Sequence, residues 1–467
     1  MENFDVIIIG AGPAGYVAAI RCAQLGKKTA IINKSSSLGG TCLNVGCIPS
    51  KALLESSELY SQVQSELQQH GINVAQVSLD LAVSQQRKQK IVTDLTSGIS
   101  LLMKSNAISV YHGEAILETE TQVSIKLTSG SNTMITASNI ILAPGSKPAV
   151  LKSALVDDNL IVDSTGALTF EAVPESLAII GAGVIGVELG SVWQRYGSKV
   201  VVYEFLDSLL PIADHEVSQQ ATKLLKKQGL EFHFASQVTA TEIDGDKVKL
   251  SYKDSTGEHS KIFNKVLVAT GRIANTNKLC SNKVKLNIDE KGFIKVDAQC
   301  KTNIDTIYAI GDAVRGPMLA HKASGEAIMV AELISGNFAK VNYDIIPFII
   351  YTHPEIAWCG ATEQQLKQNN IAYNVGKFHF MANGRAKAAA ETDGFIKIIA
   401  DKKTDRILGV HMIGSKVSEL IMQAVIAMEF NASSEDLALT MFAHPTLSEA
   451  LHEAASDVSN TAIHSIR

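Results

Sequence analysis

The stretch DVIIIGAGPAGYVAAI, residues 5–20, decides the fold of this chain. The apolar run DVIII is typical of a short buried strand, and the glycine-rich GAGPAG that follows opens a helix-like segment. The first glycine permits a tight turn, the second lets backbone approach a pyrophosphate, and the third lets the helix pack on the strand. Because a helix N-terminus favours an anion, Gly10, Gly12 and Gly15 are predicted to bind a dinucleotide.

The same pattern occurs a second time, as LAIIGAGVIG at residues 177–186, with glycines at Gly181, Gly183 and Gly186. In each copy a second strand is expected to end 18 residues after the last glycine, at Asn33 (33 − 15) and at Glu204 (204 − 186). One such motif is a weak signal. Two copies, each between a strand and a helix, indicate an α/β fold with two dinucleotide-binding units.

Length and composition agree with an ordered protein of several domains. The chain has 467 residues, of which 46% are apolar and 19% charged, and this length favours about two to four domains. The net charge of −5 argues against dedicated nucleic-acid binding. No apolar run reaches the roughly 18 residues of a membrane span, and the N-terminus, MENFDVIIIG, has no basic segment before its first strand. We therefore expect a cytoplasmic protein.

Other regions give coarser signals. Residues 52–106 are polar and rich in glutamine, which favours solvated helices with one apolar stripe. Residues 111–150 and 232–270 alternate in the manner of strands. From about residue 346 the chain mixes strand patterns with helices, for example at residues 415–430.

The segment GGTCLNVGCIPSK, residues 39–51, contains a pair of cysteines, Cys42 and Cys47. A regular helix would separate residues five apart by roughly 7.5–9 Å, whereas a disulfide needs Cα atoms about 4.4–6.8 Å apart. If the two cysteines bond, the backbone between them must be irregular, and Gly46 supplies the freedom. A short-loop disulfide in such a chain is usually a redox couple. Half a zinc site, which would need a second cluster, and two inert thiols are the alternatives.

Four further residues are candidates with a chemical reason. Lys51 lies four residues after Cys47 and would share its helical face, unless it is an ordinary surface lysine. His444, with Glu449 to orient it, suits a base for thiol chemistry, although a single histidine among 12 is more often structural. Glu204 would accept hydrogen bonds from a ribose and repel a 2′-phosphate, which favours NAD over NADP; an exposed strand-end acid is the alternative.

The two glycine motifs with this cysteine segment between them resemble the class I pyridine nucleotide-disulfide oxidoreductases, and among these the dihydrolipoyl dehydrogenases. The resemblance covers essentially the whole chain. It includes ATGR at 269–272, YAIGD at 308–312, LAHK at 319–322, YTHPE at 351–355 and AHPTLSE at 443–449.

The resemblance implies two cofactors and four functional regions. FAD would be bound by Gly10, Gly12, Gly15, Asn33, Lys51, Gly113, Gly145, Asp312 and Ala320, and NAD by Gly181, Gly183, Gly186, Glu204 and Gly271. Residues 1–148 would form the first part of the FAD domain, 149–275 the NAD domain, 276–345 a central domain completing the FAD site, and 346–467 an α+β dimerisation domain. The two dinucleotide domains would be Rossmann-like, and no metal is expected.

The resemblance also implies a chemistry. Cys42 would be the interchange thiol that meets the substrate, and Cys47 the thiol that faces the flavin. Lys51 and Glu188 would form an ion pair beside the flavin. His444, oriented by Glu449, would be the base and would reach the disulfide of a partner subunit, so that a homodimer is expected.

The implied reaction is the oxidation of protein-bound dihydrolipoamide with NAD⁺. The expected partner proteins are a lipoyl-bearing acyltransferase of a 2-oxo acid dehydrogenase complex or the H protein of glycine cleavage. Action on another disulfide, and a main role as a binding subunit of a large complex, are the rival hypotheses. Asn33 in place of an acid, Pro144 in place of a threonine, and Phe442 in place of a histidine depart from the family pattern.

Overall fold

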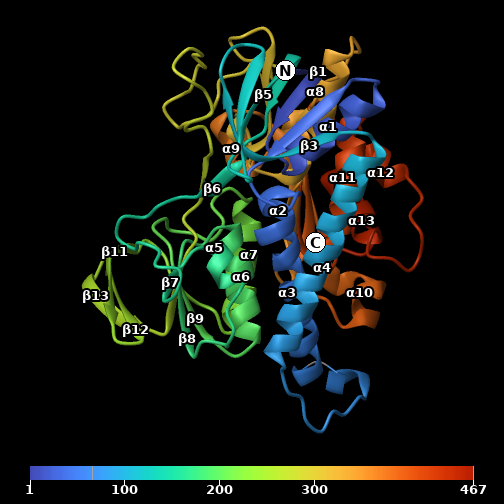
Figure 1. Ribbon diagram of the computed structural model, residues 1–467. Coiled ribbons are helices and arrows are strands. Elements are labelled where there is room, and N and C mark those ends of the chain that lie inside the picture. Colours follow the sequence, from blue (N-terminus) through green and yellow to red (C-terminus); the bar gives the residue numbers. More distant parts are fainter. Residues whose placement is uncertain (66, 466–467) are drawn as a thin grey trace. The chain divides into compact units, whose positions relative to one another are not determined.

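The computed structural model describes residues 1–65 and 67–465, which form two compact units. The first unit contains Met1–Leu53, Ala82–Ala149 and Gly271–Val341. The second contains Leu54–Leu81, Val150–Thr270 and Asn342–Arg467. Figure 1 shows the chain coloured along its sequence.

A mainly parallel sheet forms the centre of the first unit. Its strands are β1 (Glu2–Ile9), β2 (Thr29–Asn33), β3 (Ser109–Leu117), β4 (Gln122–Leu127), β5 (Asn132–Leu142) and β16 (Ile307–Ala309). Strand β1 pairs in parallel with β2 and β5, and the parallel pairs β2–β3 and β5–β16 extend the sheet on either side. Strand β4 is antiparallel to the C-terminal half of β3 and to the N-terminal half of β5.

The first glycine motif joins β1 to helix α1 (Pro13–Gln24), as predicted. Val6 and Ile8 of β1 belong to one core cluster, whereas Ile7 and Ile9 belong to another, so the strand is buried on both faces. Helix α1 packs against α8 (Ala320–Ile334) through small alanine side chains, which let the two helices approach closely.

The elements that follow include the two helices that carry the cysteines and a short pair of antiparallel strands. Helix α2 (Gly40–Val45) is followed by α3 (Cys47–Ser65), along which the chain passes into the second unit. Helix α4 (Leu81–Ser105) returns after the short η1 (Leu67–His70), so the polar helices expected in residues 52–106 are confirmed. The short strands β6 (Ser146–Pro148) and β15 (Arg272–Ala274) pair antiparallel.

The second unit contains a fully parallel five-stranded sheet. Its strands lie in the order β10 (Glu231–His233), β9 (Lys199–Tyr203), β8 (Ser176–Ile180), β14 (Lys265–Val268) and β7 (Ile161–Val162). The second glycine motif joins β8 to α6 (Val184–Arg195). Helices α5 (Ser164–Ala167) and α7 (His215–Lys227) and the antiparallel strands β11 (Gln237–Asp244), β12 (Lys247–Asp254) and β13 (Gly257–Phe263) complete this part. The structure thus confirms two Rossmann-like units.

The expected strand end at Glu204 differs by one residue, because β9 ends at Tyr203. The Glu204 N–H still donates a sheet-like hydrogen bond to the His233 carbonyl at 2.9 Å, so the difference is one of assignment at a strand end.

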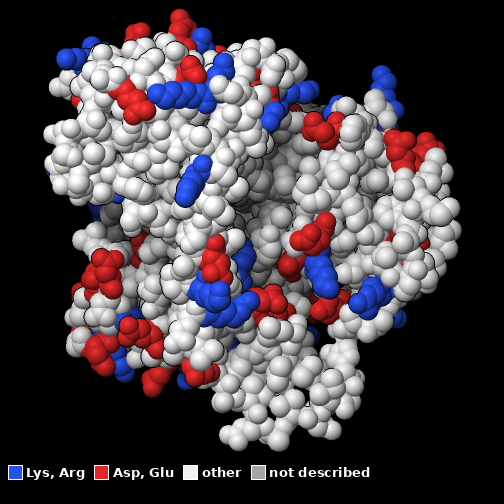
Figure 2. All heavy atoms as spheres, turned by 45° about the vertical axis from the view of Figure 1, so that its right-hand side comes forward, with Lys and Arg blue, Asp and Glu red and all other residues white. Residues whose placement is uncertain are grey.

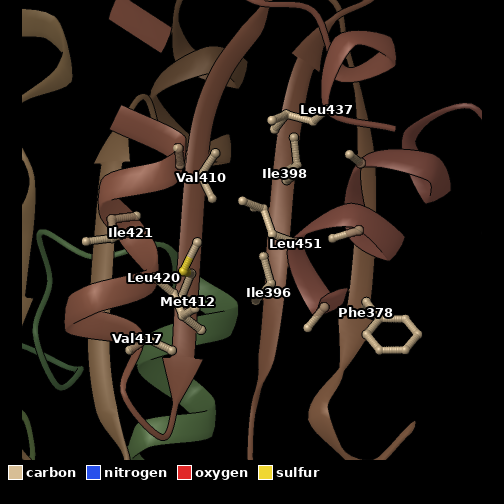
Figure 3. Packing of buried hydrophobic residues seen from close by; sticks show 14 of the residues in the cluster. Phe378, Ile396, Ile398, Val410, Met412, Val417, Leu420, Ile421, Leu437 and Leu451 are labelled. Atoms are coloured by element: carbon tan, nitrogen blue, oxygen red, sulfur yellow. The ribbon is translucent and has the colours of Figure 1, made fainter. Parts of the chain in front are cut away.

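The C-terminal part of the second unit is built on an antiparallel sheet. Its strands lie in the order β17 (Phe348–Ile350), β18 (Glu355–Gly360), β21 (Ile407–Gly414), β20 (Phe395–Asp401) and β19 (Tyr373–His379). Helices α11 (Val417–Glu429) and α13 (Glu449–Val458) share one core cluster with the side chains of Ile396, Ile398 and Met412 (Figure 3). The short helices here are α9 (Glu363–Gln368), η4 (Phe380–Ala382), α10 (Gly384–Ala389) and α12 (Ser434–Leu439). This arrangement confirms the expected C-terminal α+β part.

The opposite face of this sheet buries a lysine. Lys397 of β20 is fully buried, and its Nζ contacts the carboxylates of Asp214, Glu216 and Glu363. The three carboxylates raise the pKa of Lys397 against the opposing effect of burial. Because Asp214 caps α7 and Glu363 begins α9, the cluster ties two helices of the second unit to the sheet.

Candidate redox and dinucleotide sites

The first glycine turn has the shape that a pyrophosphate needs. Gly10 has φ +104°, and a Cβ added to Gly10 or to Gly15 would overlap the carbonyl of Ala143 or of Gly10, respectively. Gly12 is the N-cap of α1; no side chain caps this end, and no acidic residue lies in its first turn. The N–H groups there are available to an anion, so the residues present fit a dinucleotide phosphate.

The cysteine segment packs directly on this turn. The Gly39 N–H donates to the Ala11 carbonyl at 2.9 Å, and a Cβ on Gly40 would lie 2.6 Å from the Gly12 Cα. Gly40 opens helix α2, which carries Cys42. The fold therefore places a thiol next to the predicted FAD turn.

The backbone between the two cysteines is irregular, as expected. Helix α2 ends at Gly46, which has φ −142° and ψ −113°, and α3 starts at Cys47. The Asn44 side chain donates to the carbonyls of Leu38 and Gly40 at 2.9 and 2.8 Å and so fixes α2. Gly46 thus separates two helices that each present one cysteine.

The structure holds Cys42 and Cys47 as two thiols within hydrogen-bonding reach, with Cys42 half-buried and Cys47 exposed. The hydrogen bond to Cys47 and burial raise the pKa of the Cys42 thiol, while the Lys51 charge opposes the rise. Such a close pair can exchange with a disulfide. Lys51 lies one turn after Cys47 on α3, as predicted.

Glu188 lies in α6 of the second unit and is buried. Its Oε1 accepts a hydrogen bond from the Tyr351 N–H at 2.9 Å. Lys51 belongs to the first unit and Glu188 to the second, so their ion pair stays a prediction.

The other predicted FAD residues of the first unit lie in several of its elements and loops. Asp312 lies in η2 (Gly311–Ala313) directly after β16, and Ala320 is the first residue of α8. Gly145 has φ +71° in the loop between β5 and β6. Gly113 lies within β3, where it faces Leu127 of β4 and a Cβ would overlap the Lys126 carbonyl, which gives this glycine a packing role of its own.

Asn33 ends β2 and is buried. Its side-chain amide donates two hydrogen bonds, to the carbonyls of Ser35 and Ser37, both at 2.8 Å. The amide nitrogen is thereby committed to the loop, and Oδ1 is left to accept a hydrogen bond from a ribose hydroxyl. The residue present fits a dinucleotide.

The second glycine turn repeats the first and also fits a dinucleotide. Gly181 has φ +109°, and a Cβ there would lie 2.5 Å from the Ala269 carbonyl oxygen. A Cβ on Gly183 would meet no described atom within 4 Å, so the space beside it is open for a phosphate. The predicted contact Gly271 lies after β14 with φ +117°.

Glu204 accepts hydrogen bonds from backbone N–H groups in and near this second turn. Its Oε2 accepts from the Ala182 N–H at 2.7 Å, and its Oε1 accepts from the Leu206 N–H at 2.9 Å. These bonds fix the carboxylate beside the glycine turn, where a ribose hydroxyl would reach it.

The predicted base and its orienting acid lie together in the second unit. His444 Nδ1 is 2.8 Å from Glu449 Oε1, and Glu449 Oε2 accepts from the Thr446 N–H at 2.8 Å. Burial alone would raise the pKa of Glu449, but the hydrogen bonds from Thr446 and His444 outweigh it and lower the pKa. The His444 side chain is 78% exposed, so Nε2 is open to a molecule outside this chain.

Phe442, the departure closest to the base, lies against another histidine. Its ring centroid is 5.6 Å from that of His452, at an interplanar angle of 50°. His452 Nε2 in turn lies 2.9 Å from the Ala438 carbonyl. The phenyl ring therefore packs locally, in a tilted contact with the His452 ring.

Two hydrogen-bond networks contain residues that were not predicted as site residues. Ser146, Arg272 and Glu326 take part in hydrogen bonds around Asp312 and Gly311. Glu58, Arg195 and His353 form a second network, with 3.0 Å from Arg195 to Glu58 and 2.6 Å from His353 to Glu58. Arg272 and His353 belong to the ATGR and YTHPE motifs, whereas the others are ordinary polar residues in the sequence, and of these Ser146, Glu326 and Arg195 are buried.

The described residues contain no helix that combines the length and the apolar character of a membrane span. On the face drawn in Figure 2, basic and acidic side chains are interspersed.

Comparisons with known proteins place these features in context. The model of the pyridine nucleotide-disulphide oxidoreductases matches residues 4–327, and the model of the dimerisation domain of these proteins matches residues 346–455. The chain is 45% identical to the mitochondrial dihydrolipoyl dehydrogenase of Pisum sativum over 99% of its own length and 93% of the plant protein.

A bacterial relative and a solved structure also match this chain over nearly their whole length. The chain is 46% identical to the dihydrolipoyl dehydrogenase of Cupriavidus necator, over 97% of this chain and 98% of that protein. The solved structure of the Cu(II) complex of the HOCl-induced flavoprotein disulfide reductase RclA from Escherichia coli matches with a TM-score of 0.87 at 26% identity, over 98% of this chain and 99% of that one.

Proposed function

Because this chain belongs to the pyridine nucleotide-disulphide oxidoreductase family, we propose that it is a dihydrolipoyl dehydrogenase that oxidises dihydrolipoamide with NAD⁺. The observation that carries the proposal is the close pair Cys42 and Cys47, seated on the first glycine turn. A dithiol substrate can exchange with such a pair, and a neighbouring flavin can accept its electrons.

Both cofactors have residues that suit them. FAD would be held by the first turn and by Asn33, Lys51, Gly113, Gly145, Asp312 and Ala320; NAD would be held by the second turn, Glu204 and Gly271. When bound, FAD supplies the step that converts thiol chemistry into hydride transfer to NAD⁺. The residues of the chain then have to manage protons and thiols.

The proposed exchange starts from the oxidised Cys42–Cys47 pair. His444 takes a proton from one substrate thiol, and the resulting thiolate attacks the sulfur of Cys42, so that Cys47 leaves as a thiolate. The second substrate thiol then attacks the mixed disulfide. The lipoyl disulfide forms, Cys42 is released as a thiol, and the two electrons lost by the substrate remain on the cysteine pair.

The proposed ion pair between Lys51 and Glu188 would lie beside the flavin. It gains support from helix spacing, because Glu58 lies seven residues after Lys51 on α3 and Arg195 seven residues after Glu188 on α6. Seven residues are about two helical turns, so each pair shares one helical face. Arg195 and Glu58 form an ion pair at 3.0 Å.

A homodimer would bring the exposed His444 to the cysteines of the other copy. An exposed apolar stripe supports this proposal. Met422 and Ile426 of α11 and its C-cap Phe430 are exposed at a spacing of four residues, and Met441, three residues before His444, is 96% exposed. Exposed apolar surface of this extent is typical of an interface, and the stripe lies within the part that matches the dimerisation domain.

Some finer assignments belong to the same proposal. The functional division into residues 1–148, 149–275, 276–345 and 346–467 is one of them. The others are a cytoplasmic location and partnership with a lipoyl-bearing acyltransferase or with the H protein of glycine cleavage.

The test is NADH formation from dihydrolipoamide and NAD⁺ by the purified holoprotein, with NADP⁺ in parallel. We expect turnover with NAD⁺ and little with NADP⁺. Cys42→Ser should abolish turnover while FAD stays bound, and Cys280→Ser, at another half-buried thiol, is the matched control. His444→Gln should lower turnover by about 10²-fold or more, as expected for a general base.

Near-normal turnover of Cys42→Ser would remove the interchange role from that residue. A loss below about tenfold for His444→Gln would point to another base. If wild-type protein with bound FAD does not oxidise dihydrolipoamide, a panel of low-molecular-weight disulfides with NADH tests the rival substrates.

A further inference from the structure

Helix α8 buries an ion pair completely. Lys322 Nζ and Glu326 Oε2 are 3.0 Å apart, and both side chains are 0% exposed. A lysine and a glutamate four residues apart on a helix usually form a solvated surface pair. Burying both charges costs desolvation free energy and is weak support for stability, so the pair calls for another explanation.

Both side chains bind the same residue, Gly311. Lys322 Nζ donates to the Gly311 carbonyl at 2.9 Å, and the Gly311 N–H donates to Glu326 Oε2 at 2.8 Å. Gly311 has φ +73°, and a Cβ there would lie 3.1 Å from the Ala14 side chain of the first glycine motif. The ion pair therefore supplies hydrogen-bond partners for both the N–H and the carbonyl of Gly311. This glycine packs closely against the first glycine turn.

The next residue, Asp312, is held from the other side. Its Oδ2 accepts from Ser146 Oγ at 2.5 Å, and Ser146 Oγ accepts from Arg272 Nε at 2.8 Å. Arg272 also donates to the Ser146 carbonyl at 2.8 Å. One oxygen of Asp312 is thus fixed, and within the described part of the chain Oδ1 is left to accept a hydrogen bond from a ligand.

We propose that Lys322 and Glu326 are positioning residues for FAD, which hold the Gly311 peptide and thereby set the direction of the Asp312 carboxylate. The inference rests on the proposed function, in which Asp312 contacts the flavin cofactor. An apolar pair at these positions could pack α8 against the loop equally well. It could not supply the donor and the acceptor that the Gly311 carbonyl and N–H require.

The decisive variant removes both charges together. Lys322→Met/Glu326→Leu leaves no unpaired buried charge, and replacing a buried ion pair by apolar side chains of similar size often leaves stability unchanged. We expect the holoprotein to fold, but to release FAD on dilution with at least about tenfold weaker affinity, in line with lost hydrogen bonds to charged groups. The visible circular dichroism of the remaining bound flavin should change as well, which a merely structural role would not produce.

Three companion variants keep the test sharp. Ser146→Ala removes the hydroxyl on Asp312 without touching the buried pair and should also weaken FAD binding. Glu326→Gln keeps an acceptor for the Gly311 N–H but leaves the buried Lys322 charge unpaired, so it should lower stability, while the protein that folds should retain most of its FAD affinity. Lys90→Ala/Asp94→Ala removes an exposed pair of the same spacing from α4, and FAD release should match the wild type.

Wild-type FAD affinity and an unchanged flavin spectrum in both the double variant and Ser146→Ala would overturn the inference. FAD release is measured without dihydrolipoamide. A wild-type protein that binds FAD but does not oxidise dihydrolipoamide therefore contradicts the proposed substrate only, and the inference is decided separately by its variants.

Discussion

The two glycine turns share one architecture but differ in the residues that hydrogen-bond to them. In the first turn, the Ala11 carbonyl accepts the Gly39 N–H of the segment that leads to Cys42, and the side-chain amide of the strand-end residue Asn33 donates to Ser35 and Ser37 of its own loop. In the second turn, the strand-end residue Glu204 bonds the turn directly, through the Ala182 N–H.

The first turn suits a cofactor that stays bound, and the second turn suits a cofactor that binds and leaves in each cycle. The first turn is covered by the cysteine segment, whose Gly40 packs on Gly12. Beside Gly183 of the second turn, a Cβ would meet no described atom within 4 Å. A cofactor that must leave in each catalytic cycle needs an open site, whereas one that only passes electrons can be enclosed.

The largest effect should come from the third glycine of each turn. A Cβ on Gly15 or Gly186 would overlap a carbonyl of its own turn, so valine at either position must distort the turn. Gly15→Val should yield protein without FAD. Gly186→Val should keep FAD and its yellow colour but lose NAD⁺-dependent turnover by about 10²-fold or more, because binding and orientation of the nicotinamide are both disturbed.

The measurements are the FAD content of purified protein and the KM for NAD⁺. Gly183→Ala is a milder partner, because its Cβ meets open space and stability should not change. Loss of FAD from Gly186→Val would show that the two turns are not independent, and would break the comparison.

An intermediate effect is expected from Glu204→Ala. The change removes an acceptor for the ribose and two hydrogen bonds to backbone N–H groups. The KM for NAD⁺ should rise about tenfold, in line with a lost charge-assisted hydrogen bond, while that for NADP⁺ should fall, since a repelling carboxylate is gone. Steady-state kinetics with both nucleotides measure the ratio; an unchanged ratio would move the selectivity to other residues.

The smallest effect is expected from Asn33→Asp. The new carboxylate would be a stronger acceptor for a ribose, but the two bonds donated to Ser35 and Ser37 would be lost. The two lost bonds cost about 2 kcal/mol together, and a bond from the ribose to a charged acceptor regains about the same, so the FAD affinity should change by no more than about threefold. Flavin fluorescence on dilution gives the affinity, and a change beyond tenfold in either direction would show that one term dominates.

Buried lysines show where inference from sequence fails. Lys322 and Lys397 are both fully buried, although lysine is among the residues most often exposed. Each is followed or surrounded by acidic residues, Glu326 in one case and three carboxylates in the other. A pattern of charges four residues apart predicts a surface pair, and no local feature of LAHKASGE indicates that α8 turns this face inward.

What the sequence determined by itself is local. The glycine spacings predicted two dinucleotide turns, the cysteine spacing with Gly46 predicted irregular backbone between Cys42 and Cys47 if they bond, and the His444–Glu449 spacing predicted that Glu449 orients the histidine. Each depends on the geometry of a few consecutive residues, which the residue types fix through steric limits and helix periodicity.

Only the tertiary structure decided which distant segments meet. It brought Gly39 and Gly40 onto the first turn, Ser146 onto Asp312 with Arg272 bonded to Ser146, and Lys322 and Glu326 onto Gly311. These contacts join residues up to 166 positions apart, as between Ser146 and Asp312, and they depend on which helix faces and strand ends the packing turns inward. Burial then converts ordinary polar side chains into obligatory hydrogen-bond partners, because an unpaired polar group away from water is costly.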